Sequence, residues 1–123
     1  MEKINKSEDN GNVSISEEVV ATIAGLAAAD VEGVAGLTSR LASDIKGIVN
    51  KKTIGKGIQV IINETSVVVD IFINVKFGYK FIDVAQKVQK AVETSVESMT
   101  GLEVETVNVN IVGVIISKPA QND

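Results

Sequence analysis

The sequence contains no cysteine and no histidine. Without cysteine there can be no disulfide, no thiolate metal ligand and no cysteine nucleophile. Without histidine there is no imidazole to bind a metal or to act as a general base near neutral pH. Because these absences remove the commonest metal ligands and catalytic bases, we expect no metal site, no cofactor and no enzymatic activity.

Aromatic residues are scarce, at 3% of the chain, so the core must be built from aliphatic side chains. Sheets that bind single-stranded RNA normally stack bases on several aromatic rings, and the open face of the sheet predicted below offers only Phe72. The net charge of -4 and the pI near 4.8 also argue against a nucleic-acid-binding protein, whose affinity depends on neutralising phosphates.

No long apolar run is present. The N-terminus is polar, without the apolar segment of a signal peptide, and no uncharged apolar stretch approaches the roughly 20 residues of a membrane-spanning helix. We therefore expect a cytoplasmic protein with no direct membrane span. A length of 123 residues fits one domain. The composition predicts a disordered tail over residues 1–12, a single α+β domain over residues 13–116 and a C-terminal tail over residues 117–123.

The clearest pattern lies between Gly57 and Phe77. Every second residue from Val67 onward is apolar, which predicts a long strand with one dry face. A shorter strand is expected just before it, at residues 58–62, and the polar residues 63–66 between the two predict a hairpin turn. The dry-face residues of the long strand are Val67, Val69, Ile71, Ile73, Val75 and Phe77.

Three helices are predicted. The first begins after Ser16, whose side chain suits an N-cap, and a short second helix is expected over residues 37–50. The long third helix covers residues 81–100 and ends at Gly101. The apolar face of the first helix comprises Val19, Val20, Ile23, Leu26 and Ala27. The apolar face of the long helix comprises Phe81, Val84, Val88, Val92, Val96 and Met99.

Residues 103–115 alternate again and predict a last strand, in which Gly113 indicates a bulge or a close approach. Together with the long strand and the long helix it forms a βαβ unit. The predicted fold is therefore α+β with two layers: a sheet of at least three strands, made of the hairpin and the βαβ unit, packed by helices on one side.

Two surfaces are candidates for binding a partner. The open face of the sheet mixes apolar and polar side chains, which suits protein contact or cover by the alanine-rich first helix. Its residues are Ile61, Val68, Asp70, Phe72, Asn74, Asn108 and Asn110. The second surface is a basic segment over residues 40–56, which would bind an anionic partner or simply balance acids elsewhere. Its cations include Arg40, Lys51, Lys52 and Lys56.

Two further points stay open. Three of the four aromatic residues lie between Phe77 and Phe81, and they form either a small binding site or a strand-to-helix corner whose rings plug the core; we favour the corner. Asp70 meets Glu105 or Asn108 only if the long strand and the last strand are neighbours, which the sequence does not decide.

Taken in order, nine stretches resemble the alkaline shock protein family, the small envelope stress response proteins of Gram-positive bacteria. They cover roughly residues 13–115, nearly the whole chain. The stretches are ISEEVV (15–20), IAG (23–25), VEGV (31–34), GKGI (55–58), VDI (69–71), FGY (77–79), VAQKVQ (84–89), MTGL (99–102) and VNV (107–109).

The resemblance implies a non-enzymatic cytoplasmic scaffold or regulator that acts by protein contact in envelope stress response or lipid homeostasis. Its partner would be a membrane-anchored envelope protein or an acetyl-CoA carboxylase subunit, because the short form resembles the branch linked to fatty-acid synthesis. The resemblance also implies self-assembly into a homo-oligomer, and it supplies no catalytic residues. The alternative function is a nucleic-acid-binding module that uses the basic segment of residues 40–56.

Overall fold

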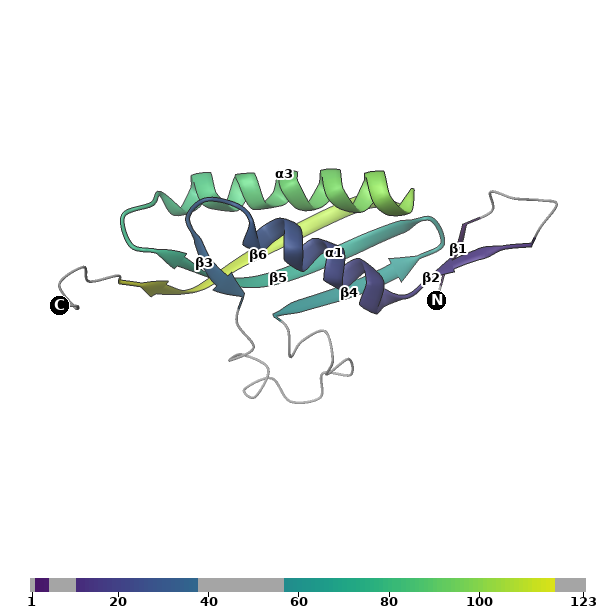
Figure 1. Ribbon diagram of the computed structural model, residues 1–123, viewed down its shortest axis with the longest axis horizontal. Coiled ribbons are helices and arrows are strands. Elements are labelled where there is room, and N and C mark those ends of the chain that lie inside the picture. The colour runs from purple at the N-terminus through teal and green to yellow at the C-terminus, as the bar shows by residue number, and fades with distance from the viewer. Residues whose placement is uncertain (1, 5–10, 38–56, 117–123) are drawn as a thin grey trace.

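The computed structural model describes residues 2–4, 11–37 and 57–116 of the chain. They form two layers, a four-stranded sheet and two helices that lie over the same face of it (Figure 1). The predicted α+β fold, with helices on one side of the sheet, is confirmed. The elements in chain order are β1 (Glu2–Ile4), β2 (Val13–Ile15), α1 (Glu17–Ala29), β3 (Val34–Leu37), β4 (Ile58–Asn63), β5 (Ser66–Lys76), α3 (Phe81–Thr100) and β6 (Glu103–Ile115).

Strand β5 is the centre of the sheet and is paired on both edges. Along one edge it pairs in parallel with β6, from Ser66–Glu103 to Lys76–Ile115. Its other edge is shared end to end by β4, opposite residues 66–71, and by β3, opposite residues 73–75, both antiparallel. A single strand therefore holds every other strand of the sheet in place.

The predicted hairpin and βαβ unit are both present. Asn63 pairs with Ser66, so the turn between β4 and β5 consists of Glu64 and Thr65 alone. Helix α3 then leads from β5 to β6, and it ends where predicted: Gly101 has a φ of 80°, and its N–H donates to the Glu97 carbonyl over 3.0 Å. The pairing of β5 with β6 answers the question of register that the sequence left open.

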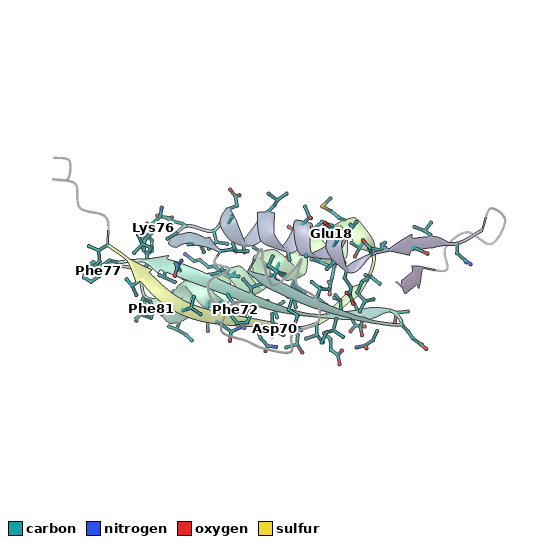
Figure 2. The ribbon with its side chains drawn as sticks, turned by 90° about the horizontal axis from the view of Figure 1, so that it is seen from below. Glu18, Asp70, Phe72, Lys76, Phe77 and Phe81 are labelled. Atoms are coloured by element: carbon teal, nitrogen blue, oxygen red, sulfur yellow. The ribbon has the colours of Figure 1, made fainter. Side chains whose placement is uncertain are left out.

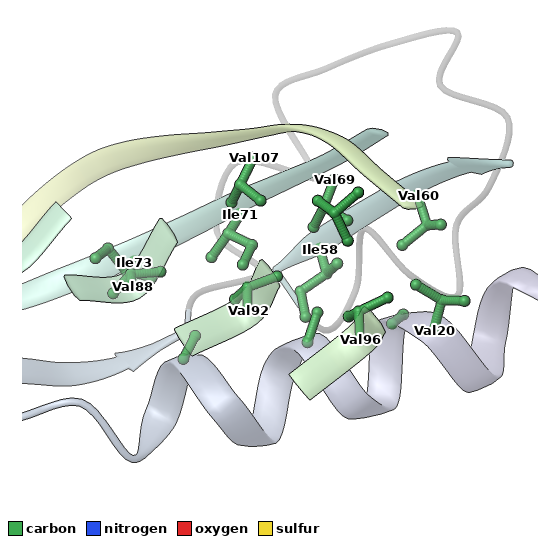
Figure 3. Close-up of a cluster of buried hydrophobic side chains, with 14 of the residues drawn as sticks. Val20, Ile58, Val60, Val69, Ile71, Ile73, Val88, Val92, Val96 and Val107 are labelled. Atoms are coloured by element: carbon green, nitrogen blue, oxygen red, sulfur yellow. The ribbon is translucent and has the colours of Figure 1, made fainter. Parts of the chain in front are cut away.

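The core fills the space between the sheet and the helices with aliphatic side chains (Figure 3). The predicted dry face of β5 is buried from Val67 to Val75, whereas the intervening residues are half-buried on the opposite face. From α3, the fully buried side chains are Val88, Val92 and Val96. Their spacing of four residues places one valine per turn against the sheet.

The predicted apolar face of α1 is correct in part: Val20 is fully buried and Ile23 and Ala27 pack against the core, whereas Val19 and Leu26 are exposed. The residues that α1 buries are Val20, Ala21, Ala24 and Ala28. Leu26 is 70% exposed. A Cβ atom on Gly25 would lie 2.9 Å from Cδ1 of Ile58, so the helix packs too closely on β4 for large side chains. The N-terminus of α1 agrees with prediction, because Ser16 is the N-cap and its Oγ accepts from the Val19 N–H over 3.3 Å.

The ends of the predicted α3 stripe also differ, because Phe81 and Met99 are both exposed. Thr100 takes the buried position that follows Val96. Its hydroxyl donates to the Val96 carbonyl over 2.6 Å and accepts from the Leu102 N–H over 3.0 Å, so the buried polar atom is satisfied.

Strands β1 and β3 were not predicted, whereas the alternation of Val13, Ser14 and Ile15 indicated the short strand β2. Strand β3 directly follows α1, where the sequence indicated only a helix end and a bend. Strand β1 lies inside the expected N-terminal tail and pairs with β2 as a separate two-stranded sheet. The short helix expected over residues 37–50 lies outside the described residues, except for Leu37, which ends β3.

Candidate functional site

The structure brings together the predicted residues of the open sheet face. Asp70 and Asn108 are paired across β5 and β6, and Asn108 Nδ2 donates to Asp70 Oδ1 over 2.7 Å. Two residues further along each strand, Phe72 pairs with Asn110. Asn110 Nδ2 donates to the Ile71 carbonyl over 3.2 Å. The structure therefore answers the question that the sequence left open: β5 and β6 are neighbours, and Asp70 meets Asn108.

Much of the hydrogen-bonding capacity of the open face is used within the sheet itself. Its asparagines bond within the sheet, and Asn74 lies so close to Gly113 that a Cβ atom there would be 2.5 Å from Asn74 Oδ1. Val68 and Phe72 are half-buried, whereas Ile61 is 48% exposed. Helix α1 packs on the opposite face, so cover of the open face by that helix is wrong. A partner role for the open face stays a prediction.

The basic segment lies outside the described residues. This applies to Arg40, Lys51, Lys52 and Lys56 alike. The binding of an anion or a nucleic acid by this segment therefore stays a prediction.

A more exposed apolar surface lies where β5 turns into α3, at one end of the molecule (Figure 2). We call it the tip cluster and define it as Phe77, Tyr79, Phe81, Val114 and Ile116. Its members surround an open hollow of about 610 Å³, which Gly78 and Lys80 also line. Phe77 is 69% exposed and Phe81 is 44% exposed, so the prediction that these rings plug the core is wrong.

The backbone explains why the rings project outward. The Phe77 N–H still donates to the Ile115 carbonyl over 2.9 Å, as the last bond between β5 and β6. The chain then turns, and the Tyr79 N–H donates to the Lys76 carbonyl over 3.3 Å. The core is already closed below this turn by Val75 and Val84, which are buried. No space is left inside for the rings, so they lie beyond the end of the sheet.

Tyr79 is tied to the loop between α1 and β3. Its hydroxyl donates a hydrogen bond to Oε2 of Glu32 over 3.1 Å. This bond, and the negative charge of the carboxylate, disfavour the tyrosinate and raise the pKa of Tyr79 above its ordinary value of 10.0. The hydrogen bond fixes the ring against the protein while Phe77 stays free for contact.

The pKa of Tyr79 can be measured directly, because the chain has one tyrosine and no tryptophan. An absorbance titration is expected to give a pKa above 10.0. The stability that the bond supplies is present below the ordinary tyrosine pKa and is lost as the pH rises through the raised pKa. In the Glu32→Gln variant the pKa is expected to fall toward its ordinary value. An unchanged pKa in that variant would contradict the bond.

A second apolar hollow, of about 620 Å³, lies between α1 and α3. Ile23, Leu26 and Met99 line it, with Lys87 and Lys90 at its rim. It was missed because the sequence placed Leu26 and Met99 in the core. The available signal was the position of each residue on its helix: Leu26 lies two residues from the buried Ala24 and Ala28, and Met99 is adjacent to the buried Thr100.

The fold and its surfaces define a small two-layer α+β domain that offers apolar contact surfaces. The chain matches the model of the alkaline shock protein 23 family, described by a cell envelope-related function, over residues 5–116. It belongs to this family, and the resemblance noted in the sequence is confirmed. In the described part of the chain, none of the helices has the length and apolarity needed to cross a membrane.

Similar proteins occur in Gram-positive bacteria. The uncharacterized protein YqhY of Bacillus subtilis is 33% identical over 90% of this chain and 82% of its own length. The uncharacterized protein YloU of the same organism is 34% identical over 89% of this chain and 92% of its own length. A stress response regulator gls24 homolog of Streptococcus pyogenes is 28% identical over 85% of this chain, which spans 59% of that protein.

Proposed function

We propose that this protein is a non-enzymatic scaffold or regulator that acts by protein–protein contact in cell-envelope stress response or lipid homeostasis. The observation that carries the proposal is the exposure of the tip cluster. Exposed apolar patches of neighbouring residues on small proteins usually mark interaction sites, and aromatic side chains dominate the binding energy of protein interfaces. The family's cell envelope-related function supplies the setting.

The shape of the tip cluster favours a protein partner over a small ligand. Ligand pockets typically bury 70–90% of a small molecule, whereas the hollow at the tip is bounded by rings that are themselves largely exposed. A broad partner surface would cover Phe77 and Phe81 together and remove both rings from water. A metabolite in the open hollow would leave both rings exposed to water.

The charged residues around the tip cluster indicate what kind of partner surface would fit it. Lys76 precedes the tip cluster and Lys80 lies within its turn, and both are exposed. The carboxylate of Glu32 accepts the hydrogen bond of Tyr79. The surface that fits is therefore apolar with an acidic rim. A membrane-anchored envelope protein or an acetyl-CoA carboxylase subunit would be the partner, and recruitment by the membrane-anchored one would place this chain at the membrane.

A pull-down from native lysate, with soluble and membrane fractions analysed separately by mass spectrometry, tests the proposal. Changing Phe77 and Phe81 together to serine is expected to reduce recovery of the partner by at least about tenfold, as expected for interface hot spots. The fold should be retained, because both rings lie outside the core. Matched controls are Ile61→Ser on the open sheet face and Leu26→Ser in the helix hollow, which should leave recovery unchanged.

Other outcomes would move the function elsewhere. Loss of the partner on Ile61→Ser but not at the tip would assign the contact to the open sheet face. Recovery of nothing but nuclease-sensitive RNA would support the nucleic-acid-binding alternative. Binding to protein-free anionic vesicles, lost in the tip variant, would show that the rings enter lipid instead of a protein partner.

A further inference from the structure

Strand β6 forms one edge of the sheet. Its inner edge pairs with β5 from Glu103 to Ile115. On its outer edge, no strand of the described part of the chain pairs with it. An unpaired strand edge presents free N–H and C=O groups and can accept an extended segment of a different protein as an additional strand. Which of these groups are free therefore decides where such a segment could bind.

The hydrogen bonds identify which residues of β6 direct their backbone groups outward. The Phe72 N–H donates to the Gly57 carbonyl, so even-numbered residues of β5 point away from β6 and odd-numbered residues point toward it. In a parallel pair, the residue opposite an inward-pointing one faces away. Opposite the odd-numbered residues of β5, the outward residues of β6 are Val104, Val107, Val109, Ile111 and Val114.

Helix α3 covers the first half of the outer edge with polar side chains. Glu97 Oε2 accepts from the Val104 N–H over 2.9 Å, and Gln89 Nε2 donates to the Val107 carbonyl over 3.1 Å. These bonds confirm the outward direction of both strand residues. A segment that paired there would have to displace both side chains, so the first half of the edge is closed.

The second half of the edge is open in the described part of the chain. The outward N–H and C=O groups of Val109, Ile111 and Val114 have no hydrogen-bond partner there. Residues 106–116 also lack charge and proline, which commonly block pairing at exposed edges. A register shift leaves Val112 as a bulge, which bends the strand and limits the free edge to a short stretch.

The side of α3 above this edge changes character along the helix. Intervals of three or four residues place five residues on one side of it: Ile82, Gln86, Gln89, Glu93 and Glu97. Because Glu97 bonds to Val104 and Gln89 to Val107, the helix runs antiparallel to β6, and Ile82 follows toward the end of the strand. Ile82 is 59% exposed and has no polar group with which to cap the edge. The second half of the edge therefore has an apolar side chain above it instead of a polar cap.

We propose that residues 109–114 accept an extended segment of the protein partner as a further strand of the sheet, with an apolar side chain of that segment packed on Ile82. The inference rests on the proposed function, because the free half-edge ends at Val114, which lines the hollow of the tip cluster. One partner can therefore cover the tip cluster and continue along the strand. Strand addition supplies affinity through main-chain hydrogen bonds and specificity through alternate side chains.

The charges at the two ends of β6 define the composition of the segment. Lys76, which pairs with Ile115, and Lys80 are exposed beside the end of the strand, and neither forms an ion pair within the described residues. Glu103 and Glu105 are exposed at its start. A segment that is apolar at alternate positions and carries its acidic residues near the tip would meet the lysines and avoid the glutamates.

A proline variant tests the pairing in the same pull-down from native lysate. The Val109 N–H points away from β5, so Val109→Pro removes a donor from the outer edge and leaves the bonds to β5 in place. Recovery of the partner is expected to fall by at least about tenfold. The matched control is Ile62→Pro on the outer edge of β4, where the N–H also points away from β5 and the side chain is likewise partly buried. The control should leave recovery unchanged.

Amide hydrogen exchange, followed by NMR on the full chain, tests the pairing without a substitution. The protein is measured alone and with the partner recovered in the pull-down. The amides of Val109, Ile111 and Val114 are expected to exchange at least about tenfold more slowly in the complex, because each gains a hydrogen bond. The amide of Ile62 should exchange at the same rate in both samples.

The outcomes separate this inference from the proposed function. If the double variant of Phe77 and Phe81 loses the partner while Val109→Pro retains it and the three amides do not slow, strand addition is overturned and the tip contact stands. If the double variant retains the partner in full, the proposed function is overturned and this inference falls with it. Slow exchange of the three amides in the free protein would show that a second copy already occupies the edge, which would also overturn the inference.

Discussion

Replacing Ile71 with alanine is expected to lower the free energy of unfolding by about 2–5 kcal/mol. Ile71 lies in the middle of β5, pairs with Ile58 on one side and Val109 on the other, and has 0% of its surface exposed. The change removes apolar contacts and leaves a cavity that strands held on both edges cannot collapse into. Urea unfolding followed by circular dichroism measures the loss.

The control for this prediction is Ile61→Ala, which removes the same atoms from an exposed position on β4. Fully exposed surface substitutions usually change the free energy of unfolding by no more than about 0.5 kcal/mol. Because Ile61 is only half-exposed, its expected loss is somewhat larger but still below about 1 kcal/mol. Equal losses in the two variants would contradict the placement of β5 at the centre of the core.

Replacing Gly33 with alanine is expected to lower stability by about 2–5 kcal/mol. Gly33 has a φ of 99°, which L-residues adopt at a penalty of about 1–2 kcal/mol. A Cβ atom there would also lie 2.8 Å from Cγ2 of Val84 and 2.9 Å from Cδ2 of Tyr79. Overpacking of this kind typically adds about 1–3 kcal/mol. Thermal unfolding with partner binding measured in parallel tests both consequences, since displacement of Tyr79 should also disturb the tip cluster.

Gly101→Ala separates backbone strain from crowding. Gly101 has a φ of 80°, and nothing lies within 4 Å of the position of its Cβ atom. Its replacement should therefore show the strain alone, about 1–2 kcal/mol. If Gly33→Ala were no worse than Gly101→Ala, the close packing of Gly33 against Val84 and Tyr79 would be contradicted.

Much of the fold could be predicted because strong periodicity coincides with burial. The alternation along β5 and the four-residue spacing of valines along α3 each leave one face that must be covered, and each covers the other. Strand β6 was predicted to its exact bounds, Glu103–Ile115, because both its alternation and its boundary at Gly101 are visible in the sequence. These are local signals that the tertiary structure reinforces.

The failures arise where tertiary contact overrides local pattern. Strand β3 has four residues, includes Gly36, and is defined by its pairing with β5 rather than by its own alternation. In α1, hydrophobicity pointed to Leu26, but the close approach to β4 at Gly25 selects the alanine face instead. The aromatic residues near Phe77 were assigned to the core because apolar rings usually are buried. No local signal shows that the core is already full below them.

Of the candidate surfaces, one could be predicted from the sequence and one could not. The open sheet face could be predicted by alternation, and its internal bonds, such as Asn108 to Asp70, followed once β5 and β6 were neighbours. The tip cluster could not, because exposure depends on how many buried residues precede the turn. The hydrogen bonds from Gln89 and Glu97 of α3 to the outer edge of β6 could not be predicted either, since they depend on how the helix lies over the strand.

The central claim is that the tip cluster contacts a protein partner, and site-specific photo-crosslinking in native cells tests it most directly. A photoreactive residue is placed at Phe77 in the tip, Ile61 on the open sheet face, or Leu26 in the helix hollow. All three positions are exposed, so access of the probe is matched. We predict a discrete protein adduct from position 77 and none from positions 61 and 26. An adduct at position 61 or 26 with none at position 77 would contradict the account.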